Sequence, residues 1–343
     1  MAGMLMLCVR MLASLLMLAG VIWGCGALWF QWAPKALAVP VRAWAPVIWA
    51  GLGGYAISLL WLARGPRGLL IYGLMFVVLL VWWSSIKPSQ QRDWAADVSR
   101  QLSGEVAGSL VYLHNVRNFD WHDKDHADER WEERVYDLDQ LVSVDMATSY
   151  WMGPAIAHTL VSFGFADGTG PRRYLTFSVE IRKEKNEAFS SLGGFFKEFE
   201  QSLVAADERD ILRVRTNMRG EEVYLDSVAM SRPAMRELFL AYVAKANALV
   251  RRPAFYHTLF ANCTTIVFDM VRGIVPGLPL DWRLLANGYL PQYLDSLHAL
   301  APHDDFAVLQ EAGHINARAI QAASDEDFSQ AIRRGVPQVT GSR

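Results

Sequence analysis

Three strongly apolar, uncharged stretches open the chain, at residues 11–32, 43–63 and 68–86. Each is long enough, as a helix, to cross a hydrocarbon layer of about 30 Å. The first stretch is too long for a removable signal peptide and lacks a small-residue cleavage site, so it is expected to remain as an anchor. The pattern therefore predicts three transmembrane helices within residues 1–90.

Beyond residue 103 the pattern changes to short strands separated by Gly, Asp, Pro and Asn. A helix follows from Ser231 to Arg252, with Pro233 in its first turn and Leu238 and Tyr242 on its apolar face. Together these elements predict an α+β fold with an antiparallel sheet. The predicted strands cover residues 110–117, 132–138, 141–150, 155–165 and 174–182.

The last two predicted strands form a hairpin around the turn at residues 166–171. If the hairpin is centred near residue 169, His158 lies opposite Glu180 and both side chains share a face. Glu180 then either orients His158 or pairs with Arg182 on a solvated face. A register shift of two residues would instead place Ser178 or Arg182 opposite the histidine.

Charge helps to place the domains. The net charge of -2 over 343 residues gives no sign of a nucleic-acid partner. Positive residues flank the apolar stretches almost evenly, and Arg10 with the short 64–67 loop favours a cytoplasmic N-terminus. We expect a membrane anchor at 1–90, an extracytoplasmic catalytic domain at 91–300 and a C-terminal helical tail at 301–343.

Cys263 is the candidate nucleophile. Cys8 and Cys25 belong to the first predicted membrane helix, so Cys263 is alone in the rest of the chain. Asn262 is a favoured N-cap, which places Cys263 in a first helical turn, where backbone N–H groups favour a thiolate. The functional interpretation is an exposed thiolate, and the alternative is a small apolar cysteine in the core.

A thiol nucleophile needs a base, and the base needs an orienting group. His158 is the only ionisable residue in an apolar strand, so it is the first candidate, with Glu180 as its orienter. His257, six residues before Cys263, is a second candidate base or a wall of the pocket. The His122 and His126 cluster within residues 120–128 is interpreted as a solvated loop rather than a metal site. No metal or cofactor is expected.

Several segments of the chain, in order from about residue 111 to about residue 300, resemble the Lnb N-terminal periplasmic domain family. This resemblance implies a membrane-anchored bacterial lipoprotein N-acyltransferase with a permuted papain-like domain, in which His158 matches the base and Cys263 the nucleophile. Glu180, Arg182 and Asn262 match motif positions without assigned roles, and the three spans ahead of the domain depart from the family's pattern. The matching segments are residues 162–165, 178–184, 206–210, 255–257, 262–265 and 288–291.

The expected function is a periplasmic thiol acyltransferase in the bacterial inner membrane. It would move an acyl chain from a membrane lipid or lipoprotein ester to an amine through an acyl-cysteine, with Asn262, Arg182 and His257 near the substrate. One alternative is a papain-like amidase or peptidase that acts on cell-wall peptides with the same Cys-His pair. The other is a non-enzymatic periplasmic scaffold in which Cys263 is a core residue.

Overall fold

The computed structural model describes residues 2–33, 37–62, 65–185, 187–322 and 327–339. The described chain divides into two compact units, residues 1–89 with 190–199 and residues 90–189 with 200–343. Arg64, part of the short loop between two apolar stretches, lies outside the described residues.

The first unit contains the three apolar helices, α1 (Ala2–Gln31), α2 (Val39–Trp61) and α3 (Gly65–Ser85). Each is long and apolar enough to cross a membrane. Helix α1 begins ahead of the apolar stretch and includes Arg10, which was expected to precede it. Buried polar groups bind between the helices, where the Trp49 Nε1 and Tyr72 hydroxyl groups donate to the Val21 and Met17 carbonyls.

Residues 190–199, far along the chain, pack against these helices. Phe196 stacks on Phe30 at the end of α1 with 5.4 Å between ring centroids. The Gln31 side chain donates to the Phe196 and Lys197 carbonyls at 2.9 Å each, and Lys197 Nζ donates to the Trp83 carbonyl at 2.8 Å. This segment therefore belongs with the apolar helices rather than with the sheet that precedes and follows it in the chain.

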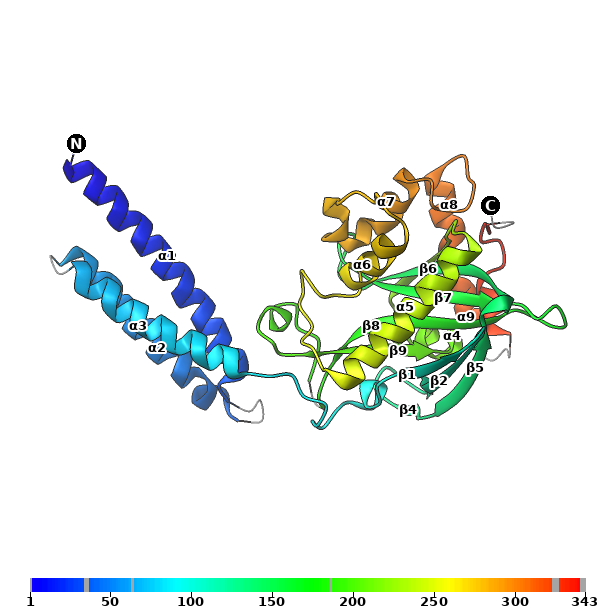
Figure 1. The fold of residues 1–343 in the computed structure, drawn as a ribbon, viewed down its shortest axis with the longest axis horizontal. Helices are drawn as coiled ribbons and strands as arrows, with labels where there is room; N and C mark the ends of the chain where they lie inside the picture. Colours follow the sequence, from blue (N-terminus) through cyan, green and yellow to red (C-terminus); the bar gives the residue numbers. More distant parts are fainter. Residues whose placement is uncertain (1, 34–36, 63–64, 186, 323–326, 340–343) are drawn as a thin grey trace. The chain divides into compact units, whose positions relative to one another are not determined.

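The second unit is built on an eight-stranded sheet with the order β1-β2-β9-β8-β7-β6-β10, and β5 also pairs with β2 (Figure 1). All pairs are antiparallel except β2 with β9, so the expected purely antiparallel sheet is wrong at that junction. The strands are β1 (Ser103–Ala107), β2 (Leu110–Arg117), β5 (Trp131–Asp137), β6 (Leu141–Tyr150), β7 (Ala157–Phe165), β8 (Arg173–Arg182), β9 (Glu200–Ala206) and β10 (Glu222–Ser227).

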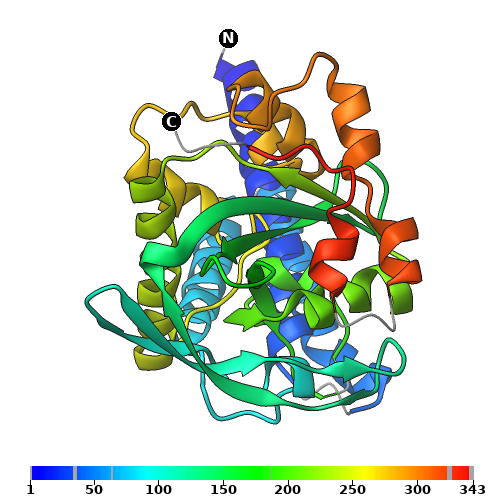
Figure 2. The same cartoon turned by 90° about the vertical axis from the view of Figure 1, so that its right-hand side faces the viewer.

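Helices cover both faces of this sheet. Helix α5 (Arg232–Arg251) buries Leu238 and Tyr242, as predicted, against one face. Short helices cover the other face, including α4 (Glu208–Ile211), between β9 and β10 in the chain, and α10 (Phe328–Ile332), which follows the last strand. Figure 2 shows the strands between α5, yellow-green, and the C-terminal helices in red. The fold is thus α+β. Successive residues of a strand point to opposite faces of the sheet, so they enter two different cores.

Residues 301–322 and 327–339, from the predicted C-terminal helical tail, pack closely against the sheet. Besides α10, they form α8 (Phe306–Gly313) and α9 (Asn316–Gln321). Ile315, Ala319 and Phe328 are buried in the second core.

The β7–β8 hairpin has the predicted register. Leu160 pairs with Ser178 and Val161 with Phe177, which places His158 across from Glu180. The 120–128 segment forms a small second sheet of β3 (Asp120–Trp121) and β4 (Ala127–Asp128), in which His122 lies 3.2 Å from Asp128 and both side chains are exposed.

Candidate active site

Cys263 lies in the turn that leads into α6 (Thr265–Ile274). Thr264 occupies the N-cap position, so the predicted cap at Asn262 is wrong by two residues. Asn262 still binds the start of the helix, because its Oδ1 accepts the backbone N–H groups of Thr264 and Thr265 at 2.9 and 2.8 Å. The helix begins at Thr265, so Cys263 precedes its first turn instead of lying within it. Only 3% of Cys263 is exposed, so the expected exposed position is wrong.

The buried thiol lies beside His158, and this pairing decides its ionisation. Burial raises the pKa of Cys263, but the charge and hydrogen bond of His158 lower it, as do the Thr159 backbone N–H and the Thr264 hydroxyl. The net effect lowers the pKa of Cys263 below its ordinary value. A purely apolar core would raise that pKa, so these polar contacts separate Cys263 from an inert core cysteine.

Two residues of β8, Ser178 and Glu180, hold the His158 ring. His158 Nε2 lies 2.6 Å from Ser178 Oγ and 3.3 Å from Glu180 Oε1. Because Nε2 is engaged there, Nδ1 is the nitrogen left for the thiol. Burial lowers the pKa of His158, but the charges of Glu180 and Cys263 outweigh it and raise that pKa to about 10. The geometry therefore favours an imidazolium–thiolate pair.

Glu180 is fixed by two further groups. Its Oε1 accepts the Ser178 hydroxyl at 2.7 Å and Arg215 Nη2 at 2.8 Å. Burial raises the pKa of Glu180, but the charges of His158 and Arg215 hold it well below its usual range. Of the two roles considered for Glu180, these contacts favour orienting His158 over pairing with Arg182. Ser178 and Arg215 complete a chain of polar groups that ends at His158.

Arg215 comes from a short π-helix (Val214–Met218) that follows α4. Its Nη1 donates to the Ile211 carbonyl at 2.7 Å, which aims the other end of the guanidinium at Glu180. Such wide helical turns recur at functional sites. Arg215 is 35 residues from Glu180 in the chain, and no local sequence pattern points to it.

Arg182 and His257 bind backbone groups other than those of His158, Glu180 and Cys263. Arg182 donates to the Val98 and Ser99 carbonyls at 3.0 and 2.8 Å and stacks on Trp94, so it ties β8 to the segment before β1. His257 stacks on Phe260, and its Nδ1 accepts the Leu259 and Phe260 backbone N–H groups at 3.2 and 3.3 Å. The second candidate base thus shapes the loop ahead of Cys263.

Asn287 is a site residue that the sequence did not suggest. Its Nδ2 lies 3.8 Å from Cys263 Sγ and 3.1 Å from Thr264 Oγ1, and its Oδ1 accepts the Ala157 backbone N–H at 3.0 Å. Asn287 directly precedes the Gly288–Pro291 segment in the chain. The family resemblance of that segment was the one signal in the sequence that pointed near Asn287.

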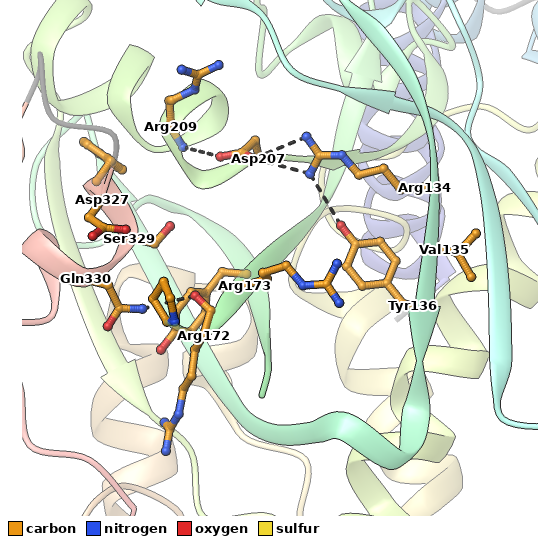
Figure 3. Close-up of a pocket in the computed structure, with 13 residues that line it drawn as sticks. Arg134, Val135, Tyr136, Arg172, Arg173, Asp207, Arg209, Asp327, Ser329 and Gln330 are labelled. Atoms are coloured by element: carbon orange, nitrogen blue, oxygen red, sulfur yellow. Dashed lines mark hydrogen bonds and ion pairs between the residues drawn. The ribbon is translucent and has the colours of Figure 1, made fainter. Parts of the chain in front are cut away.

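A cavity of about 580 Å³ lies elsewhere on the domain (Figure 3). Arg134 on its wall binds Asp207 at 3.3 Å and Glu132 at 2.7 Å, so its charge is already matched. None of the six predicted site residues lines this cavity. The lining residues are Arg134, Val135, Tyr136, Pro171, Arg172, Arg173, Tyr174, Asp207, Arg209, Asp327, Phe328, Ser329 and Gln330.

The polar chain behind His158 predicts a pH effect on thiol alkylation. Iodoacetamide reacts with the thiolate, so labelling of Cys263 should rise with pH through a midpoint well below the value of about 8.5 for a free cysteine. Glu180→Gln removes a charge that stabilises the imidazolium, so it should shift this midpoint upward and slow turnover by on the order of ten- to a thousandfold. Peptide mass spectrometry would separate Cys263 from Cys8 and Cys25.

Glu222→Gln is the matched control, because Glu222 pairs with His314 at 2.5 Å on the exposed surface. This substitution should leave the labelling of Cys263 unchanged. An unshifted midpoint in Glu180→Gln would remove Glu180 from the site, and labelling only after unfolding would favour the core interpretation of Cys263.

Comparison with known proteins gives a match for the part of the chain that holds these residues. The family model of the Lnb N-terminal periplasmic domain matches residues 127–288. His158, Glu180, Cys263 and Asn287 all fall within that range. No curated protein and no solved structure matches the chain.

Proposed function

We propose, from the match of residues 127–288 to the family model of the Lnb N-terminal periplasmic domain, that this chain is a membrane-anchored thiol acyltransferase. The family and the three apolar helices fit a membrane protein with a periplasmic domain. The observation that carries the enzymatic proposal is the contact of Cys263 with His158, backed by Glu180. We place the catalytic domain on the periplasmic side of the bacterial inner membrane.

The reaction would proceed in two transfers. The Cys263 thiolate attacks the carbonyl carbon of a lipid ester, a C–S bond forms, and the ester C–O bond breaks as the His158 imidazolium gives its proton to the leaving alkoxide. An amine, such as a lipoprotein N-terminus, then attacks the thioester. His158 takes the proton of the amine, an amide forms, and the thiolate leaves in its starting state.

Exposed apolar side chains around the site support a lipid donor. Three loops lead into His158, Cys263 and Asn287. The Gly288 N–H donates to the Ala155 carbonyl at 3.1 Å, and Asn287 Nδ2 donates to Thr264 Oγ1 at 3.1 Å, so the loop of Asn287 binds both of the others. Clusters of exposed apolar groups mark interaction surfaces, and tryptophan favours the membrane interface. The exposed residues on the three loops are Trp151, Met152, Phe260, Leu280, Trp282 and Leu285.

The test is acyl transfer by the purified full-length chain in detergent micelles. With a diacyl phospholipid donor and a lipopeptide that has a free N-terminal amine, the amine should gain one acyl chain, measured by mass spectrometry. Cys263→Ser under the same conditions should give no product. Release of free fatty acid alone, or cleavage of an added muropeptide, would replace the transferase with the hydrolase. The absence of turnover with every substrate would favour the scaffold.

A further inference from the structure

We propose that Asn287 is a further catalytic residue, which donates a hydrogen bond to the oxyanion that forms when Cys263 attacks an acyl carbonyl. This inference rests on the proposed function, because it assumes that Cys263 is acylated. Asn287 is not among the residues that the sequence singled out as part of the site.

The hydrogen bonds of Asn287 fix which end of its amide faces the thiol. The Ala157 backbone N–H can only donate, so the side-chain atom that meets it at 3.0 Å must be the oxygen. The amide nitrogen therefore faces Cys263 and Thr264. One of its two hydrogens serves Thr264 Oγ1 at 3.1 Å, and the other is directed toward the region of Sγ at 3.8 Å.

That second hydrogen lies where the oxyanion would form. A carbonyl carbon bonded to Sγ carries its oxygen beside the sulfur, and a donor at 3.8 Å from the sulfur can reach this oxygen at a hydrogen-bond distance of about 3 Å. The same distance is long for a strong bond to the thiolate itself.

The backbone around Asn287 is held firmly enough to keep the donor aimed. Gly288 follows directly and has no room for a side chain, because an added Cβ would lie 2.1 Å from the Pro154 carbonyl oxygen. The Tyr150 hydroxyl donates to the Gly288 carbonyl at 2.6 Å. Such preorganised donors stabilise charge that develops only in the transition state, so they raise kcat without a matching change in KM.

The test compares acylation of Cys263 with its alkylation in Asn287→Ala and Asn287→Asp. Acylation by a p-nitrophenyl acyl ester passes through an oxyanion, whereas iodoacetamide displaces iodide at a saturated carbon and forms none. We expect acylation, followed as p-nitrophenol release, to fall about 10²- to 10³-fold in kcat with KM little changed. In Asn287→Ala the rate and pH midpoint of alkylation should stay as in the wild type. Asn287→Asp places a carboxylate beside the thiolate, so its alkylation midpoint should rise.

Asn287→Asp keeps the shape and the bond from Ala157, yet replaces the donor with an acceptor, so it should be impaired as strongly as alanine. Asn247→Ala is the matched control. Asn247 also bridges backbone groups through its amide, to the Gly104 N–H and carbonyl at 3.0 and 2.7 Å, but it joins α5 to β1 away from the thiol. This variant should acylate at the wild-type rate.

Two outcomes would overturn the assignment while the proposed function stands. One is wild-type acylation in both Asn287 variants. The other is an equal loss of acylation and alkylation in Asn287→Ala, or a raised alkylation midpoint in that variant, which would make Asn287 a support of the thiolate. If the wild type forms no acyl-Cys263 with any ester, both this inference and the proposed function fail.

Discussion

Replacing Cys263 with serine or His158 with alanine is expected to lower acyl transfer at least about ten-thousandfold, because a nucleophile and its base act as a unit. A serine hydroxyl is far less acidic than the thiol, and His158 alone cannot make it a comparable nucleophile. Without His158, the buried thiol loses the charge that lowers its pKa. Product formation by mass spectrometry, with single-turnover detection of acyl-Cys263, measures both losses.

The double variant should be no worse than either single variant. His257→Ala is the informative comparison, because His257 was the second candidate base and lies in the loop ahead of Cys263. We expect a far smaller loss there than in His158→Ala. Equal losses would move the base to His257, and an unfolded Cys263→Ser protein, seen by circular dichroism, would point to a packing role for the cysteine.

Arg333→Met is expected to destabilise the sheet domain by about 3–5 kcal/mol, because it leaves two buried carboxylates without their cation. Arg333 Nη2 lies 2.7 Å from both Asp145 Oδ2 and Glu208 Oε1, and both acidic side chains are completely buried. The guanidinium also stacks 3.4 Å from the centre of the Tyr174 ring. Urea unfolding of the full chain in detergent, followed by near-UV circular dichroism, measures the change.

The loss should shrink as the pH is lowered, because protonated carboxyl groups need no cation. Arg236→Met is the matched control. Arg236 binds Asp139 at 3.0 Å with both side chains well exposed, and such a surface pair contributes at most about 1 kcal/mol. A small effect of Arg333→Met, equal to that of Arg236→Met, would show that residues after 300 contribute little to the stability of the domain.

Local patterns in the sequence determined the apolar helices, most strands and the β7–β8 register. Each of these follows from neighbouring residues, because a strand alternates its faces and the turn at 166–171 sets the pairing that brings His158 to Glu180. The binding of Asn262 to the start of α6 is equally local, since its side chain binds backbone groups two and three residues ahead. The His158, Glu180 and Cys263 candidates came from these local patterns and from the family resemblance.

Only the tertiary structure decided which distant residues surround Cys263 and His158. Arg215 reaches Glu180 from a π-helix, and Asn287 reaches Cys263 from a loop, where the cysteine is buried. The parallel pairing of β2 with β9, and the packing of residues 190–199 on the apolar helices, likewise join segments far apart in the chain. Such contacts carry no periodic signal, because their energy comes from complementary surfaces that meet only once the chain has folded.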